Sequence, residues 1–233
     1  MKLHFPAFLI GCLLTIASLA QPAESVATLQ ARAKSFMNAG DFENALLVLR
    51  QALILAPNDL ELGKDLVLTY TLKRDFARAR ENVITLCDRP NADVVCFQLA
   101  GNVFKALEET KECERYYKIG LKKFPNSGPL YSEYGELLWS SKDPRAIQLW
   151  EKGIQTDPGY GGNYYNAAVY YYYTTEKVWG LIYGEIFINL EGLSERSRSM
   201  RETLLKGYKE KLFIDADIKA VAEKVSKIGR AHV

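Results

Sequence analysis

The stretch Gly-Asp-Phe-Glu-Asn-Ala at positions 40–45, followed by the unbroken run 46–54 and by Ala-Pro-Asn-Asp at 56–59, decides the fold. It predicts a turn, a helix and a stop. Gly40 suits the left-handed conformation that ends a preceding helix, and Asp41 can cap the next helix. Pro57 cannot continue that helix and marks its end. Within the helix, apolar residues recur at helical spacing and form one stripe: Leu46, Leu49 and Leu53.

Similar blocks follow along the chain, and each of them ends in a proline. The blocks cover 74–90, 108–125 and 141–158, and the prolines are Pro57, Pro90, Pro125 and Pro158. Upstream of the first block a further helix has its own stripe, formed by Leu29, Arg32, Ala33 and Phe36. Two antiparallel helices of this length cannot bury their apolar faces alone, but stacked copies can. Few segments alternate with a period of two, so the pattern predicts an all-helical solenoid.

The blocks resemble the tetratricopeptide repeat, a degenerate motif of about 34 residues. Its first helix has an aromatic residue or leucine, a small residue and an aromatic residue. Its second helix has a small residue, a bulky apolar residue, an alanine and then a proline. The first two copies supply Leu29, Ala33, Phe36, Ala45, Leu49, Ala52 and Pro57, then Leu62, Val67, Tyr70, Ala79, Val83, Leu86 and Pro90. The next two supply Phe97, Gly101, Phe104, Cys113, Tyr117, Gly120 and Pro125, then Tyr131, Gly135, Leu138, Ala146, Trp150, Gly153 and Pro158.

The resemblance covers roughly residues 26–190 and implies an all-α, right-handed solenoid of about five helix-turn-helix repeats, assigned to residues 21–191. The fifth copy departs from the motif. It opens with Gly-Tyr-Gly-Gly at 159–162, and seven of the 14 tyrosines lie between Tyr160 and Tyr173. Gly180 takes the small position of its second helix. Residues 192–227 predict a C-terminal helical extension that caps the solenoid with a charged outer face.

Residues 1–20 are predicted to be a secretory signal peptide. Lys2 precedes a short apolar run, and small residues precede a cleavage point after Ala20. We therefore expect a periplasmic or secreted protein. Two alternatives stay open: a membrane anchor, although the run is short for a span of about 20 residues, and a lipid anchor at Cys12, whose neighbourhood resembles a lipobox.

The last six residues, Ile-Gly-Arg-Ala-His-Val at 228–233, match the translation of a common sequencing adapter. We therefore expect a non-native tail at 228–233. We also expect the extension 192–227 to be truncated, with the natural chain continuing beyond Lys227.

The composition argues against several classes of function. The formal net charge is +2 at pH 7, and removal of Lys2 with the leader lowers it to +1, so no nucleic-acid partner is expected. The two histidines, His4 and His232, lie in the leader and in the suspect tail. Neither a histidine-based catalytic triad nor a histidine-rich metal site is therefore predicted. We expect a non-enzymatic protein with no metal and no cofactor.

Outside the leader the cysteines are Cys87, Cys96 and Cys113. Cys113 takes a small helix-contact position, which indicates packing. Cys87 and Cys96 flank one loop, where a disulfide would form in an oxidising compartment; two buried thiols are the equal alternative. Three cysteines are too few for a soft four-ligand metal site.

In the tetratricopeptide repeat family, the first helix of each pair lines a concave groove. The resemblance therefore implies a partner-binding groove with a polar, partly basic end and an aromatic end. Its predicted site residues are Lys34, Asn38, Lys64, Asn102, Lys105, Trp139, Tyr165, Tyr172 and Tyr173. The other groove positions are Gln30, Met37, Leu68, Thr71, Gln98, Ser132, Glu136 and Val169. Helical spacing places Tyr164, Tyr170 and Tyr171 in the core instead.

The sequence thus predicts a scaffold or adaptor that binds a protein or peptide in this groove, in the cell envelope. One alternative is a glycan-binding envelope protein, since exposed tyrosines also stack on sugars. The other is the helical part of a longer protein with a further C-terminal domain. A membrane is expected as a partner only through the possible lipid anchor.

Overall fold

The structure, a computed structural model, describes residues 24–174 and 176–209. Within these ranges it contains eleven helices and no strand, which confirms the all-α prediction. The helices are α1 (Val26–Asn38), α2 (Phe42–Leu55), α3 (Leu60–Leu72), α4 (Phe76–Cys87), α5 (Val94–Ala106), α6 (Thr110–Lys123), α7 (Gly128–Ser140), α8 (Ala146–Thr156), α9 (Gly161–Tyr172), α10 (Lys177–Glu191) and α11 (Glu195–Gly207). None of the described helices is long and apolar enough to cross a membrane.

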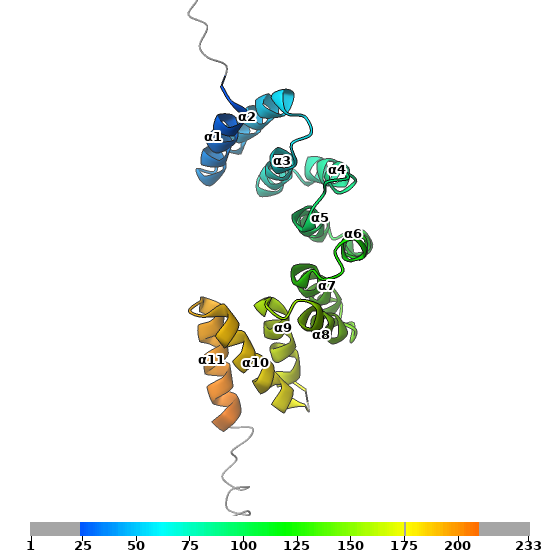
Figure 1. Cartoon of the computed structure of the whole chain (residues 1–233), viewed down its shortest axis with the longest axis vertical. Coiled ribbons are helices and arrows are strands. Elements are labelled where there is room, and N and C mark those ends of the chain that lie inside the picture. Colours follow the sequence, from blue (N-terminus) through cyan, green and yellow to red (C-terminus); the bar gives the residue numbers. More distant parts are fainter. Residues whose placement is uncertain (1–23, 175, 210–233) are drawn as a thin grey trace, which may run out of the picture.

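Consecutive helices pack as pairs, and the pairs stack into an arc (Figure 1). Each odd-numbered helix from α1 to α9 contacts the even-numbered helix that follows it, and each even-numbered helix contacts the next pair. The first helices of successive pairs also contact one another, from α1 to α9. Helices α3, α5 and α7 lie on the inner side of the arc, α4, α6 and α8 lie on its outer side, and α11 packs on α10. This is the solenoid that the repeats predict.

Most helices start at a residue whose side chain caps the exposed backbone amides. Asp41, Asp59, Asp75 and Asp93 each accept a hydrogen bond from the backbone amide three residues later. Ser127 does the same at the start of α7. Each such cap contributes about 1 kcal/mol to stability. The acidic and hydroxyl residues of the inter-helix loops therefore fix where the helices begin.

Small residues allow the paired helices to approach closely. A Cβ atom placed on Gly135 would collide with the indole nitrogen of Trp150, which is 2% exposed. A Cβ atom on Gly180 would lie 2.7 Å from the backbone nitrogen of Tyr172, so α9 and α10 touch backbone to backbone at this point. At Gly135 and Gly180, the small positions read from the sequence are thus contact points within a pair.

The turn inside each of the first four pairs places one residue in the left-handed region. Gly40 has φ 75°, and Arg74, Glu108 and Lys142 take the same place in the next three pairs with φ 63°, 59° and 58°. A side chain at such an angle strains the backbone. Glycine relieves that strain in the first pair alone.

Two apolar clusters form the core. The larger one runs from Leu29 in α1 to Ala167 in α9 without interruption. The smaller one joins α9, α10 and α11 through Tyr164, Leu181, Phe187 and Leu204. Of the helical extension predicted at 192–227, the structure describes α11, which begins at Glu195, and the residues after Lys209 lie outside the described ranges. The predicted leader and the suspect tail lie outside them as well.

Candidate functional site: the concave face and its aromatic end

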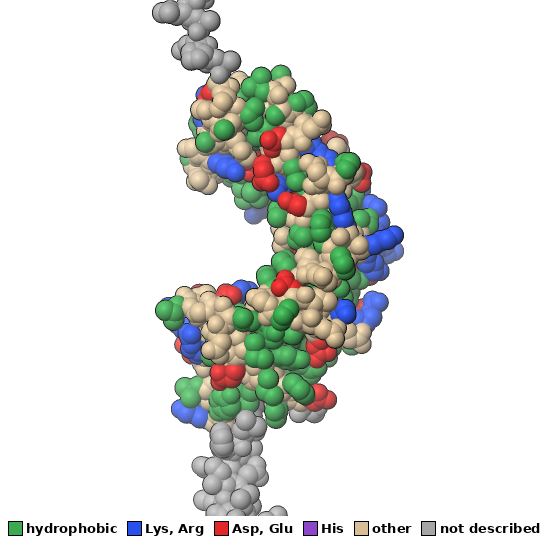
Figure 2. All heavy atoms as spheres, in the orientation of Figure 1, with side chains coloured by type: hydrophobic (Ala, Val, Ile, Leu, Met, Phe, Trp, Pro, Cys, Tyr) green, Lys and Arg blue, Asp and Glu red, His purple; other side chains and the backbone are tan. Residues whose placement is uncertain are grey.

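The inner side of the arc is hollowed, as the space-filling view shows (Figure 2). A row of polar residues follows this wall, with one member in the first helix of each pair: Gln30, Lys64, Gln98, Ser132 and Asn166. Several of them bind the neighbouring repeat. Gln30 Nε2 donates to Asp65 at 2.7 Å, and Asn166 Nδ2 donates to the Ser132 hydroxyl at 3.0 Å. Part of the predicted groove wall therefore serves to join repeats.

Lys64 is the predicted site residue most involved in such contacts. It is 9% exposed, and its ammonium donates to the Asp93 carboxylate at 2.8 Å and also pairs with Glu61. Burial alone would lower the pKa of Lys64, but the hydrogen bonds to Asp93 and Glu61 outweigh it and raise that pKa. We expected Lys64 to be exposed in the groove, but it is buried, and its ammonium is paired with Asp93, the residue that caps α5.

The other predicted polar residues of the groove are exposed. Asn38 and Asn102 are exposed, and the Lys34 ammonium lies 3.4 Å from Asp65. Lys105 is exposed at the end of α5 and lines a hollow of about 350 Å³ together with Glu136 of α7. Two lysines of this wall, Lys34 and Lys64, thus lie beside the carboxylates of Asp65 and Asp93.

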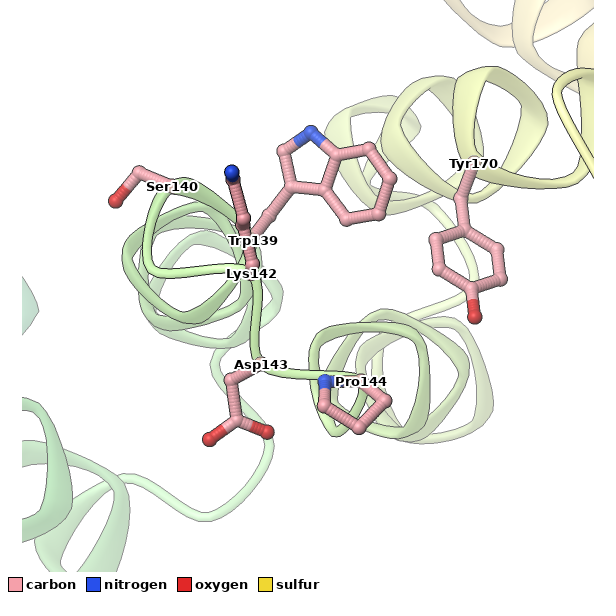
Figure 3. A pocket seen from close by; sticks show the side chains of 6 residues that line it. All are labelled: Trp139, Ser140, Lys142, Asp143, Pro144 and Tyr170. Atoms are coloured by element: carbon pink, nitrogen blue, oxygen red, sulfur yellow. The ribbon is translucent and has the colours of Figure 1, made fainter.

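Trp139 lies at the C-terminal end of α7 beside a hollow of about 500 Å³ (Figure 3). Its indole is 45% exposed and meets the Tyr170 ring edge-on, with 5.2 Å between ring centroids. Pro144 closes the far side, and Lys142 lies at the rim. Tyr170 was expected in the core, but it is only partly buried and forms a wall of this hollow. The sequence reasoning missed it because helical spacing alone does not show where the α7–α8 turn ends.

The predicted tyrosines converge on a second hollow, of about 200 Å³, between α9, α10 and α11. Tyr165, Tyr172 and Tyr173 all line it, together with Met200 and Thr203 of α11. Tyr173 is 76% exposed and Tyr172 only 8%. Tyr172 was expected to face the groove, but Leu181 and Gly207 pack around it. The structure thus brings the three tyrosines together while turning one of them inward.

The tyrosine hydroxyls that face away from these hollows are held by carboxylates. Tyr171 Oη donates to Glu151 at 2.8 Å, and Tyr183 Oη reaches the same oxygen at 3.5 Å. Burial, followed by the hydrogen bond to Glu151, raises the pKa of Tyr171 well above its ordinary value. These hydroxyls stay protonated at neutral pH and orient the tyrosine cluster.

Cys87, Cys96 and Cys113 are all free and buried. For Cys87 and Cys96, this arrangement is the second of the two alternatives, a pair of buried thiols. The Cys87 thiol donates to the backbone carbonyl of Cys96 at 3.3 Å. Burial raises the pKa of Cys96 and of Cys113 to about 11. Within residues 24–174 and 176–209, no group of acidic, histidine or cysteine side chains is arranged to hold a metal ion.

The predicted site residues therefore fall into two groups. Lys34, Asn38 and Lys64 lie near the N-terminal end of the arc, whereas Trp139, Tyr165, Tyr172 and Tyr173 lie in its C-terminal half. Asn102 and Lys105 lie between the groups, on α5. Ser140 lines both the Lys105 hollow and the Trp139 hollow, so these two are adjacent. The role of all these residues in binding stays a prediction.

No protein family matches the chain, and no curated protein matches it. Among solved structures, TTC0263, a thermophilic TPR protein of Thermus thermophilus, superimposes with a TM-score of 0.60 at 15% identity, over 78% of this chain and 100% of that one. MamA gives a TM-score of 0.55 at 18% identity, over 68% of this chain and 94% of MamA. YrrB, described as a TPR protein with an unusual peptide-binding site, gives 0.50 at 18% identity, over 76% and 92%.

Proposed function

We propose that this protein is a non-enzymatic scaffold that binds an extended peptide or a helix of a protein partner along the C-terminal half of its concave face. The fold that supports this proposal is the tetratricopeptide repeat solenoid that the chain shares with the solved structures. The observation that carries it is the pair of adjacent hollows beside Lys105 and Trp139, together with a separate hollow lined by Tyr173. Exposed aromatic residues beside apolar hollows are effective anchors for a partner.

The arrangement suits a peptide that crosses several repeats. Trp139 and Tyr173 provide large anchors, while Asn102 and Lys105 can bind backbone carbonyls or a carboxylate. The peptide-binding site for which YrrB is described adds support, since that protein has the same fold. The proposal includes export to the cell envelope, which rests on the leader-like residues 1–20.

The test uses peptides displayed on phage, selected against the immobilised protein. Enriched peptides are synthesised, and their affinity in solution is measured by fluorescence anisotropy. Trp139→Ala combined with Tyr173→Ala is expected to weaken binding at least about 10-fold, because both truncations remove exposed anchors. Tyr172 is left unchanged, since truncating a side chain that is 8% exposed would also open a cavity.

Trp179→Ala is the matched control, because this indole is 48% exposed, close to the 45% of Trp139, but projects from α10 instead. Equal affinities for the double variant and the unchanged protein would refute the aromatic site. If no peptide is enriched and a glycan array gives binding that Trp139→Ala removes, the glycan alternative replaces the proposal. A precursor that keeps residues 1–20 after expression in a Gram-negative host would refute the export step.

A further inference from the structure

Helix α6 carries a row of basic side chains on the side opposite its buried face. Its buried residues are Cys113, Tyr116, Tyr117 and Gly120. On the other side, exposed basic residues recur at intervals of four, three and four positions, and we call them the α6 basic stripe: Lys111, Arg115, Lys118 and Lys122. Since successive residues of a helix are about 100° apart, the four lie within about 60° of one another, opposite the buried residues. The stripe therefore points away from the core.

The helices beside α6 on the outer side of the arc do not have this stripe. Helix α6 contains five basic and two acidic residues, a net charge of +3, whereas α4 has +1 and α8 has 0. The whole chain has only +2. The equivalent positions of the preceding and the following repeat are occupied by Ala77, Glu81, Ile84 and Asp88, and by Pro144, Gln148, Glu151 and Gln155. Figure 2 shows lysine and arginine side chains gathered on the outer side, where α6 lies in Figure 1.

Most of the charge on the stripe is available to a partner. The two middle members pair with carboxylates of α6 itself, Arg115 with Glu112 at 2.9 Å and Lys118 with Glu114 at 2.7 Å. Their side chains nevertheless remain 53% and 60% exposed. The ammonium groups at the two ends of the stripe are exposed and have no partner among residues 24–174 and 176–209. An anion that approached the stripe would therefore meet four accessible cations, two of them unpaired.

Helix α6 lies at the outermost point of the arc (Figure 1). The outer helices α4 and α8 lie on either side of it along the arc, so the stripe runs along the convex side of the molecule. From its first to its last member the stripe is about 17 Å long, at the usual rise of a helix. A convex surface meets a flat surface first at its outermost point, so the stripe is well placed to contact an extended flat partner.

A bilayer with anionic headgroups fits a convex row of cations. Headgroups diffuse within the bilayer and can gather beneath all four cations, whereas a folded protein partner would need carboxylates in a matching row. Clusters of about four to eight lysine and arginine residues are typical of segments that bind anionic lipids. The apolar side of α6 is buried in the solenoid, so α6 would not insert into the hydrocarbon. Such binding would rest on charge and would weaken as salt is added.

We propose that the α6 basic stripe is a docking surface for a bilayer that contains anionic phospholipids. The bilayer would lie against the outer side of the arc at α6. The concave face is on the opposite side of the arc and would remain open for its own partner. The proposal therefore does not depend on what the concave face binds, and it does not require a lipid anchor.

The test is cosedimentation of the full chain with phosphatidylcholine vesicles, prepared with or without phosphatidylglycerol. The unchanged protein is expected to bind the vesicles that contain phosphatidylglycerol, and sodium chloride should weaken this binding several-fold. Lys111→Glu combined with Lys122→Glu is expected to weaken it at least about 10-fold, since each cation near an anionic surface adds to the affinity. Neither change breaks an ion pair of the described structure, and circular dichroism confirms that the variant is folded. Lys111→Arg combined with Lys122→Arg keeps both charges and should bind as the unchanged protein does.

Arg198→Glu combined with Arg201→Glu is the matched control, because it changes the net charge of the chain by the same amount on exposed positions of α11, far from α6 (Figure 1). Residues 1–20 are present in every variant, and the pure phosphatidylcholine vesicles report any insertion that they cause. The proposal is overturned if the unchanged protein binds neither kind of vesicle or both equally, or if the two glutamate variants bind alike. Binding of a polyglutamate peptide without binding to vesicles would overturn it in favour of an acidic protein partner.

Discussion

The Gln98 amide donates a hydrogen bond of 2.7 Å to the Glu133 carboxylate, across the 35 positions that separate α5 from the corresponding turn of α7. The second Glu133 oxygen accepts a bond of 2.9 Å from the buried hydroxyl of Tyr117 in α6. Glu133 therefore joins three helices of two successive repeats. Gln30 and Asp65 form the same link between α1 and α3, also at 2.7 Å. Polar side chains of the groove wall thus set the register between repeats.

Glu133→Ala is expected to destabilise the solenoid by about 1–3 kcal/mol, because it leaves the Tyr117 hydroxyl buried without its acceptor. Urea unfolding followed by circular dichroism measures the loss. Glu112→Ala is the matched control: Glu112 pairs with Arg115 on the exposed side of α6, where such a pair contributes about 0–1 kcal/mol. A double-mutant cycle with Gln98→Ala should give a coupling of about 0.5–1.5 kcal/mol. Equal losses for the two glutamates would contradict the link.

The repeat pattern was sufficient to predict the stacking, because the small residues and prolines that define it are the helix contacts and helix ends themselves. It could not predict which groove positions stay open. Lys64 is closed by Asp93, whose location depends on where the next pair begins. Tyr172 is closed by α11, a helix outside the repeat motif. Side-chain exposure at these positions is decided by neighbours that the motif does not specify.

At the left-handed turn position, loss of glycine in one repeat and introduction of glycine in another should change the stability of the protein in opposite directions. Gly40→Ala is expected to cost about 1 kcal/mol, since φ is 75° and no atom lies within 4 Å of the added Cβ, so backbone strain acts alone. Glu108→Gly is expected to stabilise the protein by roughly 0.5 kcal/mol, because it relieves the backbone strain at φ 59°. The gain is small because glycine also raises the conformational entropy of the unfolded chain. Thermal and urea unfolding measure both.

Ala106→Gly controls for glycine as such. Ala106 is the last residue of α5 and has helical geometry, so glycine there should cost about 0.5–1 kcal/mol. The strain argument fails if Glu108→Gly destabilises the protein as much as Ala106→Gly does.

Gly180→Ala tests the closest approach of two helix backbones. The added methyl group would lie 2.7 Å from the Tyr172 nitrogen and 3.0 Å from the Ala168 oxygen, and backbone atoms cannot rotate away. We expect a loss of about 1–3 kcal/mol, despite the higher helix propensity of alanine. Gly161→Ala in α9 is the control, because its nearest neighbour lies at 3.5 Å, an ordinary contact, and stability should change little. Similar stabilities for both variants would show that α9 and α10 can separate without loss.

The three described cysteines are expected to be protected thiols. In a Cys12→Ser background, none of Cys87, Cys96 and Cys113 should react quickly with Ellman's reagent at pH 8, since all three are buried and burial raises their pKa. In guanidinium chloride without reductant all three should react. One reactive thiol in the denatured protein would instead show a Cys87–Cys96 disulfide.

The same thiols predict a loss of stability at alkaline pH. The pKa of Cys113 is about 11 in the folded protein, whereas a free thiol has a pKa of about 8.5 in the unfolded chain. The folded-state pKa is raised, so the contribution is fully present below about pH 8.5 and is lost as pH rises toward 11, because the unfolded chain releases its proton first. The free energy of unfolding should fall by up to about 1.4 kcal/mol per pH unit for each such thiol. Cys113→Ala keeps the small side chain that this repeat position requires and removes one titrating group, so its urea midpoint should fall less steeply between pH 8.5 and 10.5. Parallel pH profiles for the variant and the unchanged protein would show that the Cys113 thiol does not contribute to this loss.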